Sequence, residues 1–148
     1  MDFGDTVYAT ATVSTISVLL FVPLDIVFGM DLYLVGRLLS VLIAALITGA
    51  IFAGKLADAK ILSIAKIMVL AAVVIIFVEI GQLGATDSIA AFKDSYLEAN
   101  PGALMTNIQW ATLMEMYAFQ QTLLYVVLFN AIGFVGVYLG SMLKPKKT

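Results

Sequence analysis

One apolar stretch, from Pro101 to Leu143, constrains the fold of this chain more than any other feature. It contains no proline after its first residue and no charged residue between Glu115 and Lys144. A helix crosses the hydrocarbon core of a bilayer, about 30 Å thick, with roughly 20 residues. The stretch is about twice that length. The sequence therefore predicts a long C-terminal helix that crosses a membrane and continues beyond it.

The composition indicates that the solvent of this chain is lipid. Hydrophobic residues make up 62% of the sequence and charged residues 12%, whereas soluble domains carry about 25% charged residues. A chain of 148 residues is too small to bury so much apolar surface in its own core. We therefore predict an all-α integral membrane protein in which residues 1–148 form a single transmembrane domain.

The residue types that are missing exclude several kinds of chemistry. The sequence contains neither cysteine nor histidine, so it lacks the usual ligands of zinc and haem and the usual near-neutral proton carrier. Met105, Met114 and Met116 carry thioethers, which suit Cu(I). Methionine more often fills gaps in packing, and Met114 and Met116 point to different helix faces, so copper is disfavoured. Lipid is the only expected cofactor, and the net charge of −2 argues against a nucleic-acid partner.

Four stretches are long and apolar enough to cross a bilayer. We predict transmembrane spans at residues 5–28, 32–53, 61–82 and 119–143. Between the third and fourth spans, in the loop 85–100, Ile89, Phe92 and Tyr96 share one helical face, opposite charged residues. That pattern is typical of a short amphipathic helix lying on the membrane interface. Residues 101–118 are then the extension of the fourth helix beyond the membrane, on the outer side.

The lysines predict the orientation of the spans. They gather in the connection after the second span and in the C-terminal tail: Lys55, Lys60 and Lys66, and Lys144, Lys146 and Lys147. Two crossings separate the clusters, so both lie on one side, which the positive-inside rule makes cytoplasmic. The N-terminus lacks the basic region of a signal peptide, so the first span is expected to be retained. We predict a multi-pass protein of the cell membrane with both termini in the cytoplasm.

Small residues on two spans predict close helix packing. In the second span they recur every four residues, at Gly36, Ser40, Ala44 and Thr48. In the fourth span Asn130 is followed by Gly133, Gly136 and Gly140, of which the last two form a GxxxG pair. Such residues let helix backbones approach closely. We expect Asn130 to fix the register of a helix contact, and we prefer this role to that of an ion-conducting amide.

Hydroxyl side chains follow one face of the first span, at Thr6, Thr10, Ser14 and Ser17. Hydroxyls in membrane helices usually bond their own backbone or a neighbouring helix. We favour that role, and the alternative is a polar permeation path.

Charged residues at membrane depth are candidates for function, because their desolvation is costly. Lys66 lies within snorkelling reach of the cytoplasmic end. Arg37 and Glu79 lie at similar depth on consecutive spans, and they predict a buried ion pair. We favour a structural role for this pair. In the functional alternative Glu79 is a proton or cation site with Arg37 as its counter-ion, and Asp25 and Glu115 join the cluster.

Three hypotheses of function follow. The first is a small accessory or structural subunit of a multi-subunit membrane complex, which contacts larger membrane subunits through Trp110, Met114 and Glu115 of the outer extension. The second is a small homo-oligomeric transporter or channel subunit that uses Glu79. The third, a membrane enzyme, ranks last because no nucleophile–base pair or metal-ligand set is visible. We favour the first, because packing motifs outnumber chemically reactive groups.

Overall fold

The computed structural model describes residues 1–29, 32–56, 60–85 and 88–143. Within these ranges the regular structure is entirely α-helical. The helices are α1 (Phe3–Phe28), α2 (Tyr33–Phe52), α3 (Lys60–Ala85), α4 (Ser88–Ala99) and α5 (Asn107–Met142). Four of them are long and apolar enough to cross a membrane, with crossing segments Phe3–Phe28, Leu34–Phe52, Lys60–Val78 and Leu123–Met142. The prediction of an all-helical chain with four membrane-spanning helices is therefore confirmed.

Local sequence explains where α1 begins and ends. The carboxylate of Asp2 accepts a hydrogen bond of 2.7 Å from the backbone N–H of Asp5 and so caps the first turn. The helix continues through Pro23 to Phe28. Gly29 ends it with a φ of 68°, a conformation that glycine adopts without steric cost.

The last helix begins at Asn107 and not, as predicted, at Pro101. The chain turns at Gly102, whose φ is 81°. Thr106 and Gln109 then form a capping box, in which the Thr106 hydroxyl accepts from the Gln109 N–H at 3.3 Å and the Gln109 side chain accepts from the Thr106 N–H at 2.9 Å. This reciprocal pair satisfies two free donors at a helix start, which explains the later boundary. Helix α5 still contains 36 residues and is about 54 Å long.

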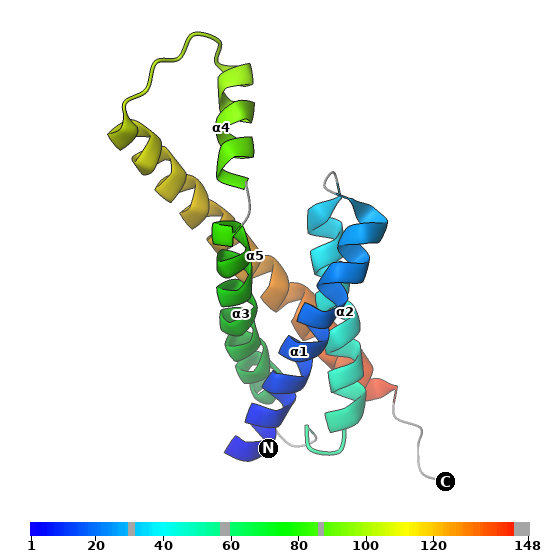
Figure 1. The fold of residues 1–148 in the computed structure, drawn as a ribbon. Helices are drawn as coiled ribbons and strands as arrows, with labels where there is room; N and C mark the ends of the chain where they lie inside the picture. The colour runs from blue at the N-terminus through cyan, green and yellow to red at the C-terminus, as the bar shows by residue number, and fades with distance from the viewer. Residues whose placement is uncertain (30–31, 57–59, 86–87, 144–148) are drawn as a thin grey trace.

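The four long helices pack in a ring in which α2 and α3 each contact α1 and α5 (Figure 1). Helices α2 and α3 are therefore diagonal to each other, although they are consecutive in the sequence. Helix α2 is the most enclosed, because 44% of its crossing segment is buried, compared with 22% for α1. The first turn of α1 and the last turn of α5 lie at the same end of the bundle.

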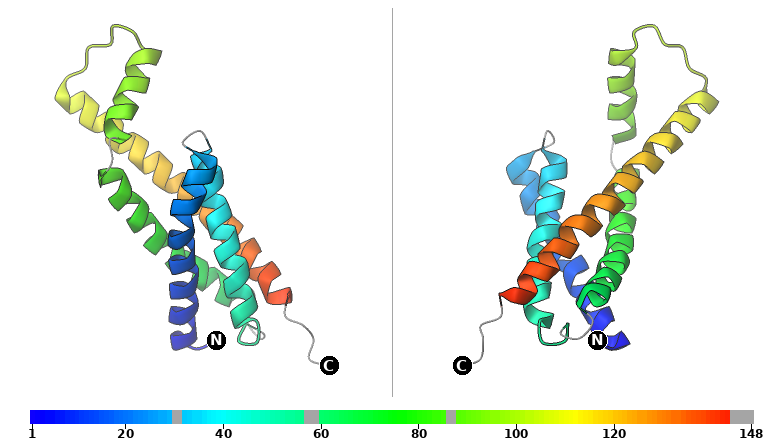
Figure 2. Two further views of the ribbon diagram at one scale, coloured as in Figure 1. Left: turned by 45° about the vertical axis from the view of Figure 1, so that its right-hand side comes forward. Right: turned by 180° about the vertical axis from the view of Figure 1, so that it is seen from behind.

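Helix α4 and the first turns of α5 extend beyond the α1–α2 turn, and α5 then descends from there into the bundle (Figure 2). We define the arm as residues 88–122 and the bundle as the rest of the helical chain. A helix was predicted within residues 85–100, and α4 is present there. In Figure 1 α3 and α4 run in a similar direction, whereas in the left view of Figure 2 they lean to opposite sides. The interfacial position predicted for this helix stays a prediction.

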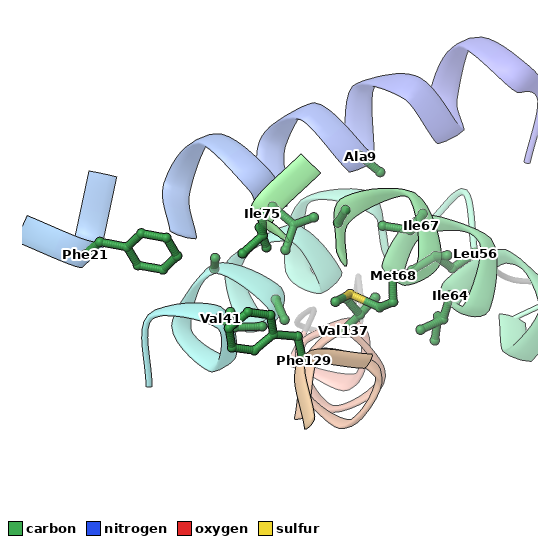
Figure 3. Close-up of a cluster of buried hydrophobic side chains, with 14 residues drawn as sticks. Ala9, Phe21, Val41, Leu56, Ile64, Ile67, Met68, Ile75, Phe129 and Val137 are labelled. Carbon is green, nitrogen blue, oxygen red and sulfur yellow. The ribbon is translucent and has the colours of Figure 1, made fainter. Parts of the chain in front are cut away.

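The apolar core lies inside the bundle, where side chains from α2, α3 and α5 meet those of α1 (Figure 3). Phe21 of α1 lies at one end of this cluster and Leu56, after α2, at the other. The largest side chains of the core are Phe21, Phe129, Leu56, Ile64, Ile67, Met68 and Ile75. Many large apolar side chains on the outside of the bundle are exposed, as expected for a surface that faces lipid.

Candidate functional site

A buried cation lies where α1 and α2 approach the α1–α2 turn. Arg37 is in the second turn of α2, and only 3% of its surface is exposed. Its Nη2 atom is 3.2 Å from Oδ2 of Asp25 on α1, and its guanidinium carbon lies 3.9 Å from the ring centroid of Phe21. The ring face attracts the cation, and the carboxylate neutralises it. These three side chains form the candidate site, which we call the Arg37 cluster.

The structure pairs Arg37 with Asp25, a residue that the sequence placed only at the margin of this site. The predicted Arg37–Glu79 pair stays a prediction, and among the described residues α2 packs mainly on α1 and α5. The side chain of Glu79 lies outside the described residues. One signal in the sequence favours Asp25: it lies about one helical turn before Gly29, and Arg37 lies about one helical turn after Leu32, on the other side of the same connection.

The two oxygens of the Asp25 carboxylate have different surroundings. Oδ2 faces Arg37, whereas Oδ1 is buried and has no hydrogen-bond partner among the described residues. The side chain as a whole is 36% exposed, so the carboxylate sits at the boundary of the bundle. A carboxylate in this position can serve as a fixed counter-ion for Arg37, and it can also accept a proton or a small cation.

Glycines bring α2 and α5 into close contact. A Cβ atom added to Gly140 of α5 would overlap the backbone of Leu46 on α2, and one added to Gly49 of α2 would overlap the Val137 carbonyl of α5. Gly136 lies against Ala45 of α2. Gly133 instead faces the end of the Met68 side chain on α3. The GxxxG pair therefore lies in a contact in which two backbones nearly touch.

The predicted small-residue row of α2 is buried along its whole length: Gly36, Ser40, Ala44 and Thr48. Its hydroxyls bond their own helix, because Ser40 donates to the Gly36 carbonyl and Thr48 donates to the Ala44 carbonyl, each at 2.8 Å. A hydroxyl that donates to a carbonyl of its own helix can face another helix without leaving a hydrogen-bond donor unpaired.

Asn130 also bonds within its own helix. Its Nδ2 atom donates to the Val126 carbonyl at 2.8 Å, and the side chain is half-buried. Within the part of the chain that the structure describes, its side-chain hydrogen bonding stays inside α5. The role of Asn130 in fixing the register of a helix contact stays a prediction.

In the arm, Trp110 connects α5 to α4. The Trp110 ring meets Tyr96 edge to face, with 5.5 Å between centroids and 76° between planes. The Lys93 ammonium lies 5.6 Å from the centroid of the same ring. Part of the predicted partner surface is therefore used by the chain itself. The side chains of the other two predicted contact residues, Met114 and Glu115, lie outside the described residues.

The three methionines that were considered as Cu(I) ligands, and disfavoured, are only partly described. Met105 lies before α5 and is half-buried, Met116 is 57% exposed, and the Met114 side chain is not among those described. Among the described residues, no group of three or more His, Cys, Asp or Glu side chains could hold a metal ion.

At the opposite end of the bundle, lysines pair with the ends of neighbouring helices. Lys55 forms an ion pair with Asp5 of α1, and the hydrogen bond to Asp5 raises the pKa of Lys55 above its usual value. Because the pKa of Lys55 is raised, the ion pair persists through the pH range in which a lysine usually loses its proton. The ion pair is lost as the pH rises above the raised pKa. Lys60 lies 4.7 Å from the ring centroid of Tyr138 on α5, and Lys66 is exposed.

These features define a multi-pass α-helical membrane protein: four apolar crossing helices, glycine-mediated helix contacts and a buried arginine paired with a carboxylate. Comparison of the chain with protein-family models, with curated proteins and with solved structures found no match.

Proposed function

We propose that this chain is a small accessory subunit of a multi-subunit membrane complex and packs against larger membrane subunits. The observation that carries the proposal is the exposed apolar surface of the arm. Leu104 is 97% exposed, Ile108 is 79% exposed and Met116 is 57% exposed. The predicted fourth span begins at residue 119, so these side chains precede it. Apolar side chains gathered outside the hydrocarbon core favour a protein partner that covers them.

The proposed orientation places the arm on the outer side of the cell membrane and both termini in the cytoplasm. Lys55, Lys60 and Lys66 support it, because they lie toward the end of the bundle opposite the arm. In this orientation α4 stands beside α5 above the membrane surface, and the partner covers α4 together with α5.

Purification in a gentle detergent, followed by mass spectrometry of the co-purifying chains, tests this function. We expect at least one foreign membrane subunit in a fixed ratio to this chain. The double variant Leu104→Ala and Ile108→Ala should lower that ratio at least about tenfold, since each truncation removes roughly 1 kcal/mol or more of buried apolar contact. The matched control, Val127→Ala with Val135→Ala, truncates two exposed residues of the α5 crossing segment and should leave the ratio unchanged. A stable homo-oligomer without a foreign chain would overturn the proposal.

The Arg37 cluster favours a second candidate, a homo-oligomeric transporter or channel subunit. An enclosed arginine beside a carboxylate with one unpaired buried oxygen suits transient binding of a proton or cation. Glu79, the site predicted from the sequence, would contribute from α3. This candidate requires that the chain alone, reconstituted in vesicles, carries a proton or cation flux that Asp25→Asn or Glu79→Gln abolishes.

A further inference from the structure

The exposed face of α3 carries a lysine among aliphatic side chains. Lys66 lies in the second turn of α3 and is exposed. Leu62 and Leu70, one turn before it and one turn after it, are also exposed. The core of the bundle lies on the opposite side of the helix, where Ile64 and Ala71 are fully buried. Lys66 therefore faces lipid from within a crossing segment.

No protein group among the described residues neutralises Lys66. The described ion pairs join Arg37 to Asp25 and Lys55 to Asp5, and Lys66 makes no polar contact with any residue that the structure describes. An ammonium group at membrane depth is costly. Side chains on a helix point toward its N-terminus, so Lys66 extends toward the membrane surface at which α3 begins. Lipid phosphates lie at that surface, within reach of a snorkelling lysine.

A cavity of about 240 Å³ opens farther along the same side of α3, where this helix packs against α1. Its walls are mainly aliphatic, and the residues that line it are Ser14, Thr15, Val18, Leu19 and Val74. Val74 follows Lys66 by two helical turns, so Lys66, Leu70 and Val74 share one face of α3 at spacings of four. This face therefore leads from the cation to an apolar groove.

We propose that an anionic phospholipid binds along this face, with its phosphate at Lys66 and one acyl chain in the groove between α1 and α3. The Cα atoms of Lys66 and Val74 are about 12 Å apart along the helix axis. Half of the hydrocarbon core is about 15 Å thick, so one acyl chain covers this distance. The groove alone would accept any apolar group, and Lys66 is what favours a lipid, which supplies a negative charge and an apolar chain in one molecule.

The charges at this end of the bundle favour an anionic headgroup over a zwitterionic one. A zwitterionic headgroup carries its own cation beside the phosphate, whereas an anionic lipid leaves the phosphate to pair with Lys66. Lys60, at the start of the same helix, adds a second positive charge. Its ammonium lies 4.7 Å from the ring centroid of Tyr138, a contact in which it remains a cation.

Native mass spectrometry of the full chain, with any subunits that co-purify, tests the headgroup contact as phosphatidylglycerol or phosphatidylcholine is added. We expect phosphatidylglycerol to bind more tightly. Lys66→Met should lower its affinity about fivefold, the contribution of one lysine near an anionic lipid surface. Lys66→Arg keeps the charge and should retain the affinity. The matched control, Lys93→Met, removes the same charge in the arm and should change nothing. Equal affinities for the two lipids, or an unchanged affinity in Lys66→Met, would overturn the inference.

A phosphatidylglycerol with a photoreactive diazirine near the end of one acyl chain tests the groove. In vesicles we expect it to label residues 14–19 of α1 at least about threefold more than the residues around Val135, when the headgroup is held at Lys66. Val135 is a suitable reference because it is 51% exposed on α5. Lys66→Met should abolish the preference. Equal labelling of the two regions in the unmodified chain would overturn the assignment of the acyl chain to the groove.

This inference does not depend on the proposed accessory role, and the outcomes of the two are distinguishable. A carbodiimide crosslink in the native membrane between Lys66 and a carboxylate of a foreign subunit would overturn the lipid site and support the accessory role. Preferential binding of phosphatidylglycerol through Lys66, in a chain that co-purifies with no foreign subunit, would support the lipid site and overturn the accessory role.

Discussion

The two halves of α5 belong to one continuous helix but are held by different means. In the bundle half, Gly136 and Gly140 bring the helix backbone against α2. In the arm half, the described contacts with α4 centre on one ring, that of Trp110, which meets Tyr96 and Lys93. Side chains near the start of this half, such as Ile108, are largely exposed.

The difference indicates where the stability of the molecule resides. Close backbone approach in the bundle gives many dispersion contacts and leaves no room for additional atoms. A single aromatic contact in the arm contributes far less, about 1 kcal/mol. We therefore expect the bundle to unfold as a unit and the arm to open separately at lower cost. An arm of this kind can adapt to a partner without disturbing the bundle.

The largest effect is expected from adding a methyl group to the α2–α5 contact. Gly140→Ala places a Cβ on the backbone of Leu46, and a backbone cannot move aside as a side chain can. The helices must separate along the contact, and we expect a loss of about 3 kcal/mol of unfolding free energy. Thermal or denaturant unfolding in detergent, followed by circular dichroism, measures it.

Gly133→Ala is the matched control for this substitution. Its Cβ meets the terminal methyl group and sulfur of Met68, which can rotate away because methionine is flexible. We expect less than half the loss seen for Gly140→Ala. Equal losses in the two variants would show that the backbone contact between α2 and α5 is not what holds this half of α5.

We expect a smaller loss of unfolding free energy when a charge is removed from the bundle than when a methyl group is added to it. Asp25→Asn keeps the size of the side chain but leaves Arg37 beside a neutral group. Loss of one member of a buried pair is costly, but Asp25 is 36% exposed, so solvent reduces the cost to about 1–2 kcal/mol. The double variant with Arg37→Met should recover part of that loss in a double-mutant cycle.

The control for charge alone is Asp94→Asn on α4, where the side chain is exposed. It makes the same chemical change in the arm and should leave the midpoint of bundle unfolding unchanged. If Asp25→Asn also leaves the midpoint of bundle unfolding unchanged, the ion pair contributes nothing to the stability of the bundle. That result would favour a role in ion or proton binding.

Much of the fold follows from the sequence, because length and hydropathy determine which segments can cross a bilayer. The boundary of α5 was missed, although Thr106 and Gln109 carry the spacing of a capping box. A preceding Asn–Pro pair offered a competing helix start, and periodicity alone does not choose between them. The direction of α4 could not be predicted, since an amphipathic face fits a membrane surface and a neighbouring helix equally well.

The candidate site was harder to predict than the fold. The burial of Arg37 follows from its place among small residues of α2, but its counter-ion depends on which helices are neighbours. Hydropathy does not encode the order of helices around a ring. The glycines identified the closest contact, yet the sequence could not show that Gly133 faces α3 while Gly140 faces α2. That distinction depends on the angle at which α5 crosses the bundle.

The smallest effect, and the sharpest test of the comparison, comes from Trp110→Ala in the arm. The substitution removes both the edge-to-face contact with Tyr96 and the cation contact with Lys93. We expect local stability to fall by about 1 kcal/mol. Hydrogen exchange measured by mass spectrometry should show faster exchange in α4 and the first turns of α5, while the midpoint of bundle unfolding stays unchanged.

Trp110→Phe keeps an aromatic ring and should restore most of the protection. If Trp110→Ala instead lowers the global midpoint as far as Gly140→Ala does, the arm and the bundle are one cooperative unit. The arm would then need no partner to hold it in place.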